Sequence, residues 1–207
     1  MKKILVTGFD PFGGERVNPA FEAVRLLPDT IAGLQLEKLE LPTVFGKAGE
    51  RLLAKIERVQ PAAVLCVGQA GGRAAITPEK VAINYMDGRI PDNAGRQPQD
   101  EPIRPDGPDA YFTTLPVRRM AARMRVAGIP AAVSYTAGTY VCNYLMYTLL
   151  DWIAGNCPGL RGGFVHVPYS MEQAACKPAG TPGMELHQIA RGLACAIETI
   201  AEELDGE

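Results

Sequence analysis

The sequence predicts a three-layer α/β/α sandwich with a mostly parallel, twisted sheet. Short apolar runs of strand length alternate along the chain with longer helical patterns, which is typical of strands joined by crossover helices. Residues 62–67 form an uninterrupted apolar run, as expected for a strand covered on both faces. The 207 residues hold no internal repeat, so we expect residues 1–207 to form one domain.

The first predicted element is a buried strand at residues 4–7. Two lysines and an apolar run resemble the start of an export signal, but the run stops at Thr7 and Gly8. It is too short for a signal peptide or a membrane span. We therefore expect the protein to stay in the cytoplasm.

Three further elements precede the strand at residues 62–67. Asn18 followed by Pro19 predicts a helix start, because Asn caps free amides and Pro suits the first helical position. That helix is expected to run to about residue 27. Residues 34–41 alternate as a strand does, and residues 47–59 carry an apolar stripe at helical spacing.

The middle of the chain contains a long irregular segment. Residues 81–84 are a short strand candidate, and residues 87–108 are rich in Pro, Asp, Gly and Asn. Loops of that length in compact domains are usually functional. After this loop, residues 115–126 are predicted to form a helix and residues 130–135 a strand.

The last third continues the alternation. Residues 141–153 predict an apolar helix, residues 164–167 a strand, and a final helix is expected from about residue 183 to residue 204. Residues 177–183 hold two Pro and two Gly, which predicts a mobile segment. In a parallel sheet the carboxyl ends of the strands meet at one edge, where ligands bind.

Composition excludes several function classes. The net charge of −2 and the absence of a basic run argue against nucleic acid or an anionic membrane as partner. Five cysteines without a C-x-x-C pair argue for free thiols and against a structural zinc site.

Cys142 is the first candidate for chemistry. It follows the predicted strand at 130–135 and the turn Ala137-Gly138-Thr139, and it opens an apolar helix. A thiol at a helix N-terminus faces unpaired amides and the positive end of the dipole, which favour the thiolate. Neighbouring amides are then available as an oxyanion hole. The alternative is a small residue that packs the first helical turn.

His166 is the candidate base. The chain has two histidines, and His166 ends a predicted strand at the same sheet edge as Cys142. His187 lies in the last helix, where an exposed polar position is the simpler interpretation. The alternative for His166 is a buried histidine that only bonds the backbone.

An acid that orients the histidine has two candidates. Glu79 follows the Gly-rich segment at residues 68–72, and Asp10 follows the first strand. Pattern alone does not choose between them, and either carboxylate is equally consistent with a solvated side chain.

The other cysteines are interpreted as structural. Cys66 and Cys195 lie among apolar residues and are expected to be buried. Cys157 follows a helix end, and Cys176 falls in the segment predicted to be mobile. The Gly-rich stretches at residues 9–14 and 68–72 match neither a phosphate loop nor a dinucleotide fingerprint.

Taken together, these segments resemble the pyroglutamyl peptidase I (pyrrolidone carboxyl peptidase) family of cysteine peptidases, in order and over nearly the whole chain. The segments that carry the resemblance are residues 7–14 (TGFDPFGG), 67–73 (VGQAGGR), 77–79 (TPE), 89–93 (RIPDN), 134–139 (SYTAGT), 141–143 (VCN) and 162–168 (GGFVHVP). Tyr140 stands where relatives often carry Phe, and the segment after Tyr169 fits least well.

The resemblance implies an activity and a site. It implies a single catalytic domain that removes N-terminal pyroglutamyl groups from peptides by acyl transfer through a thioester, with no cofactor or metal. It implies Cys142, His166 and Glu79 as the catalytic triad, which settles Glu79 over Asp10, and a homotetramer as the assembly. For substrate binding it implies Phe9 and Phe12 beside the ring, Tyr140 and Val141 nearby, and Gln69 or backbone groups as partners of the lactam. To these we add Arg89, which would help the Cys142 amide to bind the oxyanion.

Two other functions are compatible with parts of the sequence. A transferase that resembles nucleoside phosphorylases has a similar fold, but it would need phosphate and would not need Cys142. A binding module without catalysis would keep Phe9 and Phe12 and tolerate loss of His166. The presence of Cys142, His166 and Glu79 weighs against the second.

Overall fold

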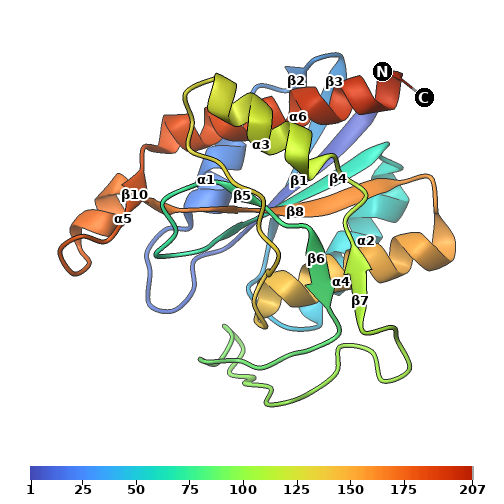
Figure 1. Cartoon of the computed structure of the whole chain (residues 1–207). Coiled ribbons are helices and arrows are strands. Elements are labelled where there is room, and N and C mark those ends of the chain that lie inside the picture. Colours follow the sequence, from blue (N-terminus) through green and yellow to red (C-terminus); the bar gives the residue numbers. More distant parts are fainter. Residues whose placement is uncertain (207) are drawn as a thin grey trace.

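A six-stranded sheet forms the centre of the computed structural model, which describes residues 1–206 (Figure 1). Its strand order is β2-β3-β1-β4-β8-β5. The four central strands are parallel: β1 (Lys3–Phe9), β3 (Leu34–Leu41), β4 (Ala63–Gln69) and β8 (Arg161–Val167). The two short outer strands are antiparallel to their neighbours: β2 (Thr30–Ile31) and β5 (Thr77–Pro78). The predicted mostly parallel sheet is confirmed.

Helices cover both faces of this sheet. Figure 1 shows α1, α3 and α6 above the sheet and α2 and α4 below it. Their bounds are α1 (Pro19–Leu26), α2 (Lys47–Val59), α3 (Val117–Val126), α4 (Val141–Asn156) and α6 (Leu186–Asp205). Strand alternation sends Ile4 and Val6 into the upper core and Leu5 into the lower core. The fold is therefore the predicted α/β/α sandwich.

Local signals in the sequence account for most of the helix boundaries. The Asn18 side chain accepts a hydrogen bond from the Ala20 amide, with Pro19 at the first helical position. Helix α2 has the predicted bounds, and its C-cap residue, Gln60, adopts the left-handed conformation with φ 50°. Helix α3 starts two residues later than expected, because Pro116 stands at its N-cap.

The strand predicted at residues 130–135 is not formed, which is a correction to the sequence analysis. The segment lies parallel to β5 but makes only the isolated bridges Ile76↔Ala131 and Glu79↔Ser134. The Ala132 amide donates to Ile76 and the Ser134 amide to Pro78. The bond that would come between them needs an N–H at residue 78, and Pro78 has none.

Strand β6 (Val81–Ile83) confirms the short strand expected at residues 81–84, and it pairs with β7 (Ala110–Phe112) at the other end of the long loop. Strand β7 and the short elements after β8 were not predicted. The chain after β8 forms β9 (Tyr169–Ser170), helix α5 (Met171–Ala175) and β10 (Gly183–Met184). Within residues 1–206, no helix combines the length and the apolar character that a membrane crossing requires.

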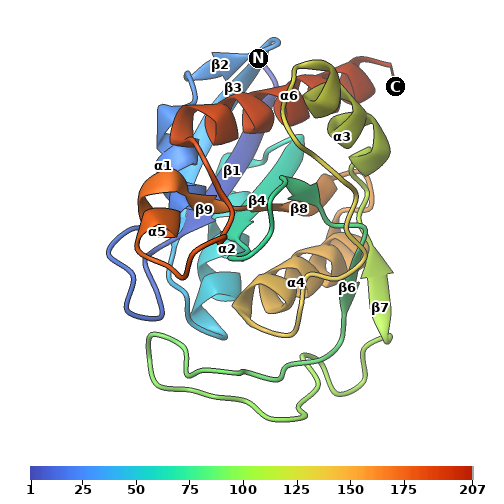
Figure 2. The same cartoon turned by 60° about the vertical axis from the view of Figure 1, so that its left-hand side comes forward.

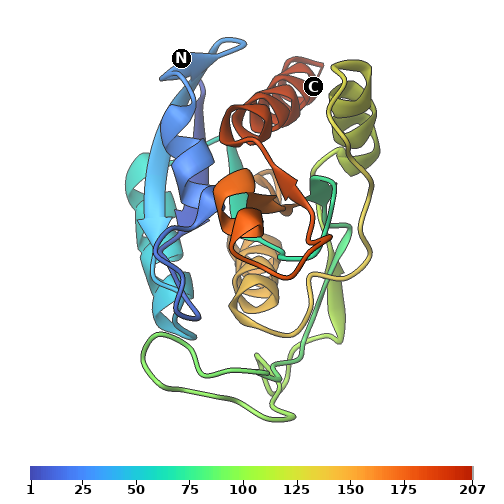
Figure 3. The ribbon, with the colours of Figure 1, turned by 90° about the vertical axis from the view of Figure 1, so that its left-hand side faces the viewer.

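The long loop between β6 and β7 runs below the sheet, on the side of α2 and α4 (Figures 2 and 3). Asp92 fixes one of its turns by accepting hydrogen bonds from the amides of Ala94 and Arg96, both at 2.9 Å. Its second oxygen accepts from the Phe45 amide at 2.9 Å. These bonds anchor the loop beside the carboxyl ends of the central strands.

Candidate functional site

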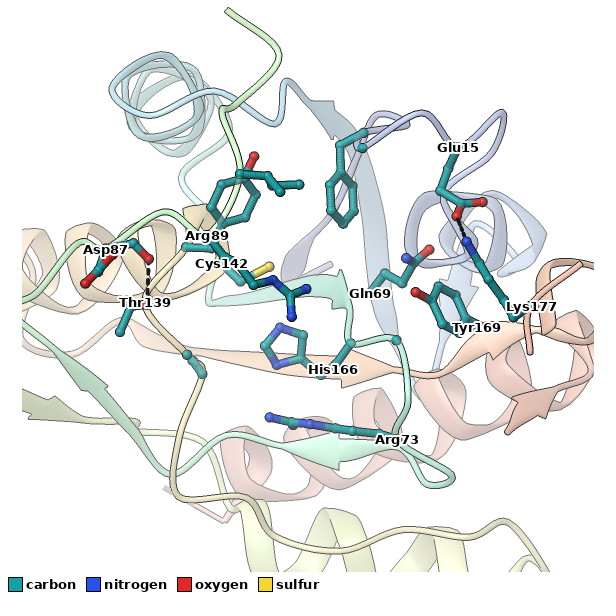
Figure 4. Close-up of a pocket in the computed structure, with 18 residues that line it drawn as sticks. Glu15, Gln69, Arg73, Asp87, Arg89, Thr139, Cys142, His166, Tyr169 and Lys177 are labelled. Carbon is teal, nitrogen blue, oxygen red and sulfur yellow. Dashed lines mark hydrogen bonds and ion pairs between the residues drawn. The ribbon is translucent and has the colours of Figure 1, made fainter. Parts of the chain in front are cut away.

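A pocket of about 450 Å³ opens at the carboxyl ends of β4 and β8. Figure 4 shows Cys142, His166, Gln69 and Arg89 turned toward its interior. The pocket is lined by residues of the β1–α1 loop, the long loop, the turn before α4 and the segment after β8. It is the edge at which the topology predicted a ligand site.

Cys142 lies in the first turn of α4, as predicted. The turn before it contains Gly138 with φ +77°, a conformation that favours glycine. Tyr140 stands at the N-cap, and within residues 1–206 its side chain makes no capping hydrogen bond. The first amides of α4 are therefore available to a ligand.

Gly68 lets the thiol approach the sheet. A Cβ built on Gly68 would lie 2.8 Å from the Cys142 sulfur and 2.7 Å from the Phe164 ring, which is closer than real Cβ atoms come. Gly68 is also the register partner of His166 across β4 and β8. The missing side chain therefore places the sulfur over the strand pair that carries the histidine.

His166 and Glu79 are joined by a buried hydrogen bond. The His166 Nδ1 atom lies 2.7 Å from Glu79 Oε1, and the Glu79 side chain is fully buried. A carboxylate only accepts hydrogen bonds, so Nδ1 carries the proton and Nε2 is left as the acceptor. Glu79 reaches this place because β5 pairs with β8, with Thr77 opposite His166.

Burial sets the charge state of this cluster. It raises the pKa of the Cys142 thiol to about 12, and the charge of Glu79 acts in the same direction. This reverses our expectation that the helix terminus would favour the thiolate. Burial also lowers the pKa of His166, against the opposing effect of Glu79. Both shifts favour the uncharged forms of the thiol and the imidazole.

In contrast to the Cys142 thiol and the His166 imidazole, the Glu79 carboxyl is held in its charged form. Burial opposes its ionisation, but the hydrogen bond and charge interaction with His166, together with the hydrogen bond from Arg73, outweigh this and hold the pKa of the Glu79 carboxyl below its usual value. The sequence analysis assigned no role to Arg73. Its Nη1 atom lies 2.6 Å from the same Glu79 oxygen that His166 contacts. The triplet Gly71-Gly72-Arg73 belongs to one of the segments that resemble the family, but nothing in the sequence indicates that Arg73 contacts Glu79.

The rival candidates lie elsewhere. Asp10 accepts hydrogen bonds from the Thr43 amide at 2.7 Å and the Asn93 side chain at 3.2 Å, so it ties loops together. His187 is exposed on α6. Cys66 is buried, as predicted, whereas Cys195 is only partly buried, and Cys157 and Cys176 are exposed.

The aromatic wall differs from the one that the resemblance implies. Phe12 and Tyr140 line the pocket with ring centroids 6.1 Å apart. The Tyr140 hydroxyl donates to the Pro91 carbonyl at 2.9 Å, which fixes the ring. Phe9 and Val141 instead lie in the lower core beneath the pocket. Phe9 points there because it lies on the same face of β1 as Leu5.

Gln69 presents a donor to the pocket. The Ser170 amide donates to Gln173 Oε1 at 3.1 Å, so the other end of the Gln173 side chain is its NH₂ group. That group donates to Gln69 Oε1 at 3.1 Å. The Gln69 amide nitrogen is therefore turned toward the interior of the pocket (Figure 4). A single backbone N–H thus fixes the orientation of two amides.

The long loop contributes Arg89 and Asp87. The Asp87 amide donates to the Thr139 carbonyl at 3.0 Å, and the Thr139 hydroxyl donates to the Asp87 carbonyl at 2.8 Å. These two bonds hold the loop against the turn before α4. Figure 4 shows the Arg89 guanidinium beside Cys142, where the sequence analysis expected it.

The side of the pocket after β8 carries an ion pair. Lys177 contacts Glu15 of the β1–α1 loop, and the Lys177 ammonium lies 5.2 Å from the centre of the Tyr169 ring. All three residues line the pocket. This segment fits the resemblance least well, and none of the three was predicted.

A thiol beside an imidazole that a buried carboxylate orients is typical of enzymes that transfer acyl groups through a covalent intermediate. Comparison with known proteins gives the particular class. A model of the pyroglutamyl peptidase family matches residues 2–203. The chain belongs to the pyroglutamyl peptidase family.

Curated relatives and solved structures agree with this assignment. Pyrrolidone-carboxylate peptidase 1 of Streptococcus pneumoniae is 56% identical over 203 residues, which are 98% of this chain and 94% of that protein. The crystal structure of Bacillus amyloliquefaciens pyroglutamyl peptidase I has a TM-score of 0.93 at 47% identity and covers 98% of both chains. Pyrrolidone carboxyl peptidase from Thermococcus litoralis has a TM-score of 0.96 at 38% identity, covering 100% of this chain and 96% of that one.

Proposed function

We propose that this chain is a cysteine peptidase that removes the N-terminal pyroglutamyl group from peptides. The observation that carries the proposal is the cluster of Cys142, His166 and Glu79 at one pocket edge. The family and the names of its relatives support the pyroglutamyl substrate. They favour a peptidase over the phosphorylase-like transferase that the fold alone allowed.

In the proposed reaction, His166 Nε2 takes the proton of the Cys142 thiol as the sulfur attacks the pyroglutamyl carbonyl. The carbon–nitrogen bond then breaks, and the imidazolium protonates the leaving amine. Water, deprotonated by the same nitrogen, hydrolyses the thioester. Glu79 holds the tautomer and stabilises the transient imidazolium. The raised pKa of the Cys142 thiol supports this order, because the thiol does not ionise without its base.

The oxyanion of the tetrahedral intermediate needs donors near the sulfur. The Cys142 amide lies in the uncapped first turn of α4, and Arg89 reaches the same region (Figure 4). We propose that these two groups bind the oxyanion. Preorganised donors of this kind are each worth about 2.7–4 kcal/mol in related acyl-transfer sites.

Substrate selection follows from the uncharged character of the lactam. We propose that Phe12 and Tyr140 flank the ring and that the Gln69 amide nitrogen donates to the lactam carbonyl. A free Glu or Gln terminus would bring an ammonium into this slot, and burying an unpaired charge is costly. Proline carries the same ammonium and lacks the carbonyl, so it would leave the Gln69 donor unpaired.

A panel of matched peptides tests the function. Peptides that begin with pyroglutamate should release that residue in phosphate-free buffer, as followed by mass spectrometry, and iodoacetamide should stop the release. Peptides that begin with Glu, Gln or Pro should stay intact. Equal cleavage of the Pro or Glu peptides would replace the proposal with a general cysteine aminopeptidase. A requirement for phosphate would favour the transferase.

We also propose that the active form is a homotetramer in the cytoplasm. Two large exposed side chains support an interface: Phe112 is 69% exposed and Tyr135 61% exposed. Their segments lie on either side of Lys80, which bonds the backbone of Thr113 and Ser134. Association of copies would remove such surface from water. Sedimentation of the purified chain at several concentrations tests the assembly, and a monomer throughout would overturn it.

A further inference from the structure

Arg73 is fixed behind the base of the proposed reaction. Its Nη1 atom contacts Glu79 Oε1 at 2.6 Å and the Thr77 hydroxyl at 2.5 Å, and Nη2 donates to the Thr136 carbonyl at 2.9 Å. Figure 4 shows the Arg73 guanidinium on the side of His166 opposite Cys142. The guanidinium therefore has one orientation, set by three contacts.

Arg73 and His166 share one carboxylate oxygen. The two nitrogen atoms lie 2.6 and 2.7 Å from Glu79 Oε1. The Glu79 side chain is 0% exposed and the Arg73 side chain 29% exposed. A carboxylate without contact to water needs a compensating cation, because an uncharged imidazole supplies a hydrogen bond but no charge. Either Arg73 or a protonated His166 can supply it.

The two ways of compensating Glu79 have opposite consequences for catalysis. A protonated His166 has no acceptor for the thiol proton, so it is inactive as a base. An arginine stays charged at every working pH. With Arg73 in contact, Glu79 is already paired, and the imidazole is free to remain unprotonated until the thiol attacks.

We propose that Arg73 is a positioning residue that neutralises Glu79 in the resting enzyme and thereby keeps His166 available as an uncharged base. This inference rests on the proposed function for its kinetic consequence, but its charge balance is measurable without substrate. It assigns to Arg73 a part in the reaction although Arg73 need touch neither the thiol nor the substrate.

Other titratable groups face the same pocket. They are Tyr140 and Cys142 at the start of α4, Asp87 and Arg89 on the long loop, Glu15 on the β1–α1 loop, and Tyr169 and Lys177 after β8. Glu15 and Lys177 pair with each other. Arg89 lies beside Cys142 (Figure 4). Among residues 1–206, Arg73 is the cationic side chain that the structure joins to Glu79.

The charge state of His166 is accessible by proton NMR. The chain has only two histidines, and exposed His187 serves as the internal reference. Removing the cation should raise the pH at which His166 titrates, because the charge of Arg73 lowers the pKa of His166. In Arg73→Gln we expect the His166 signal to titrate at higher pH than in wild type. Arg73→Lys should return the His166 signal toward wild type.

The same variants have a kinetic readout. In Arg73→Gln the acid limb of kcat/KM should move to higher pH, so that the ratio of activity at pH 6 to that at pH 8.5 falls by about tenfold or more. Arg119→Gln is the matched control, since Arg119 pairs with Glu202 on the surface at 3.0 Å. It should change neither readout.

Two results would overturn the inference. One is an unchanged His166 titration in Arg73→Gln together with a loss of activity that is equal at all pH values, which would make Arg73 a structural tie only. The other is a titration that moves to lower pH. If Arg73→Gln does not fold by circular dichroism, the pair Arg73→Gln/Glu79→Gln removes both charges. In this double variant the midpoint pH of the His166 titration should be lower than it is in Arg73→Lys. Failure of the peptide assay with the expected NMR result would reject the proposed function and leave the charge balance intact.

Discussion

The pocket has two ends: the residues that define one include a buried ion pair, and those that define the other are uncharged. At the reacting end, defined by Cys142, His166, Glu79 and Arg73, a fully buried carboxylate is paired with a fixed cation. At the recognition end, defined by Phe12, Tyr140, Gln69 and Gln173, the contacts are aromatic rings and amides. The first must hold and move a proton, whereas the second must select an uncharged ring.

This difference indicates that one set of pocket residues controls the rate of the reaction and another set controls the choice of substrate. At the reacting end, His166 comes from strand β8 and Glu79 directly follows β5, which pairs with β8, so the distance between these two side chains is set by the sheet register. Neutral donors at the recognition end are oriented by a chain of hydrogen bonds from α5. We therefore expect changes at the reacting end to lower kcat and changes at the recognition end to raise KM.

The largest effect is expected for Cys142→Ala. No other group at the reacting end can form the acyl-enzyme, so turnover should fall by about a million-fold, the loss seen when a triad nucleophile is removed. The measurement is hydrolysis of a pyroglutamyl-anilide, with circular dichroism to verify folding. Cys157→Ala is the control, because Cys157 is exposed at the end of α4. Retention of more than about a thousandth of the wild-type rate would remove Cys142 from the nucleophilic role.

Glu79→Gln should have the next largest effect. An amide can still contact the ring, but it neither enforces the required tautomer nor stabilises the imidazolium, so kcat should fall by about ten-thousand-fold with KM near wild type. Steady-state kinetics at several pH values measure both constants. A normal kcat would mean that His166 works without this acid, so the buried charge of Glu79 would have no part in catalysis.

The charge state of the free enzyme gives a pH dependence. The pKa of Cys142 is raised to about 12 and that of His166 is lowered, both mainly by burial. Alkylation of Cys142 by iodoacetamide follows the thiolate, so its rate should keep rising with pH beyond pH 9, by about tenfold per unit where one proton is lost. A preformed thiolate–imidazolium pair would instead give a plateau near neutral pH. Peptide mapping of the alkylated residue excludes exposed Cys157 and Cys176.

Local sequence rules reach two residues of the reacting end, Cys142 and His166, but not Gln173 at the recognition end, and the reason is physical. Cys142 and His166 follow from local rules, because a turn leads into a helix and strand ends meet at one edge. Gln173 lies 104 residues from Gln69, and no local pattern connects them. Ser170 and Gln173 are three residues apart, which is the spacing of a capping box, so this helix start is visible in the sequence. The five-residue helix that it opens is too short to show a helical period.

Two other differences come from context that one segment does not carry. The segment at residues 130–135 has strand-like composition, but its pairing is interrupted by Pro78 on the neighbouring chain segment. Phe9 was expected at the substrate, although the alternation from Leu5 along β1 places it in the core. Residues 130–135 could be assigned correctly only by knowing that they lie beside Pro78. Phe9 could be assigned to the core by continuing the alternation of strand β1 beyond Thr7.

The smallest expected effect tests the recognition end directly. Gln173 donates to Gln69 Oε1 and is itself buried, so Gln173→Leu would leave the Gln69 amide free to rotate. Part of the population would then present an oxygen to the lactam carbonyl, and the loss should be that of one neutral hydrogen bond, about 0.5–1.5 kcal/mol. KM for a pyroglutamyl-anilide should therefore rise by about two- to tenfold with kcat and the pH profile unchanged. Thr181→Val is the matched control, since it removes a hydrogen bond to the Pro178 carbonyl in the same segment and should leave KM alone. A fall in kcat with constant KM in Gln173→Leu would show that the amide chain serves the reacting end, and the division between the two ends would fail.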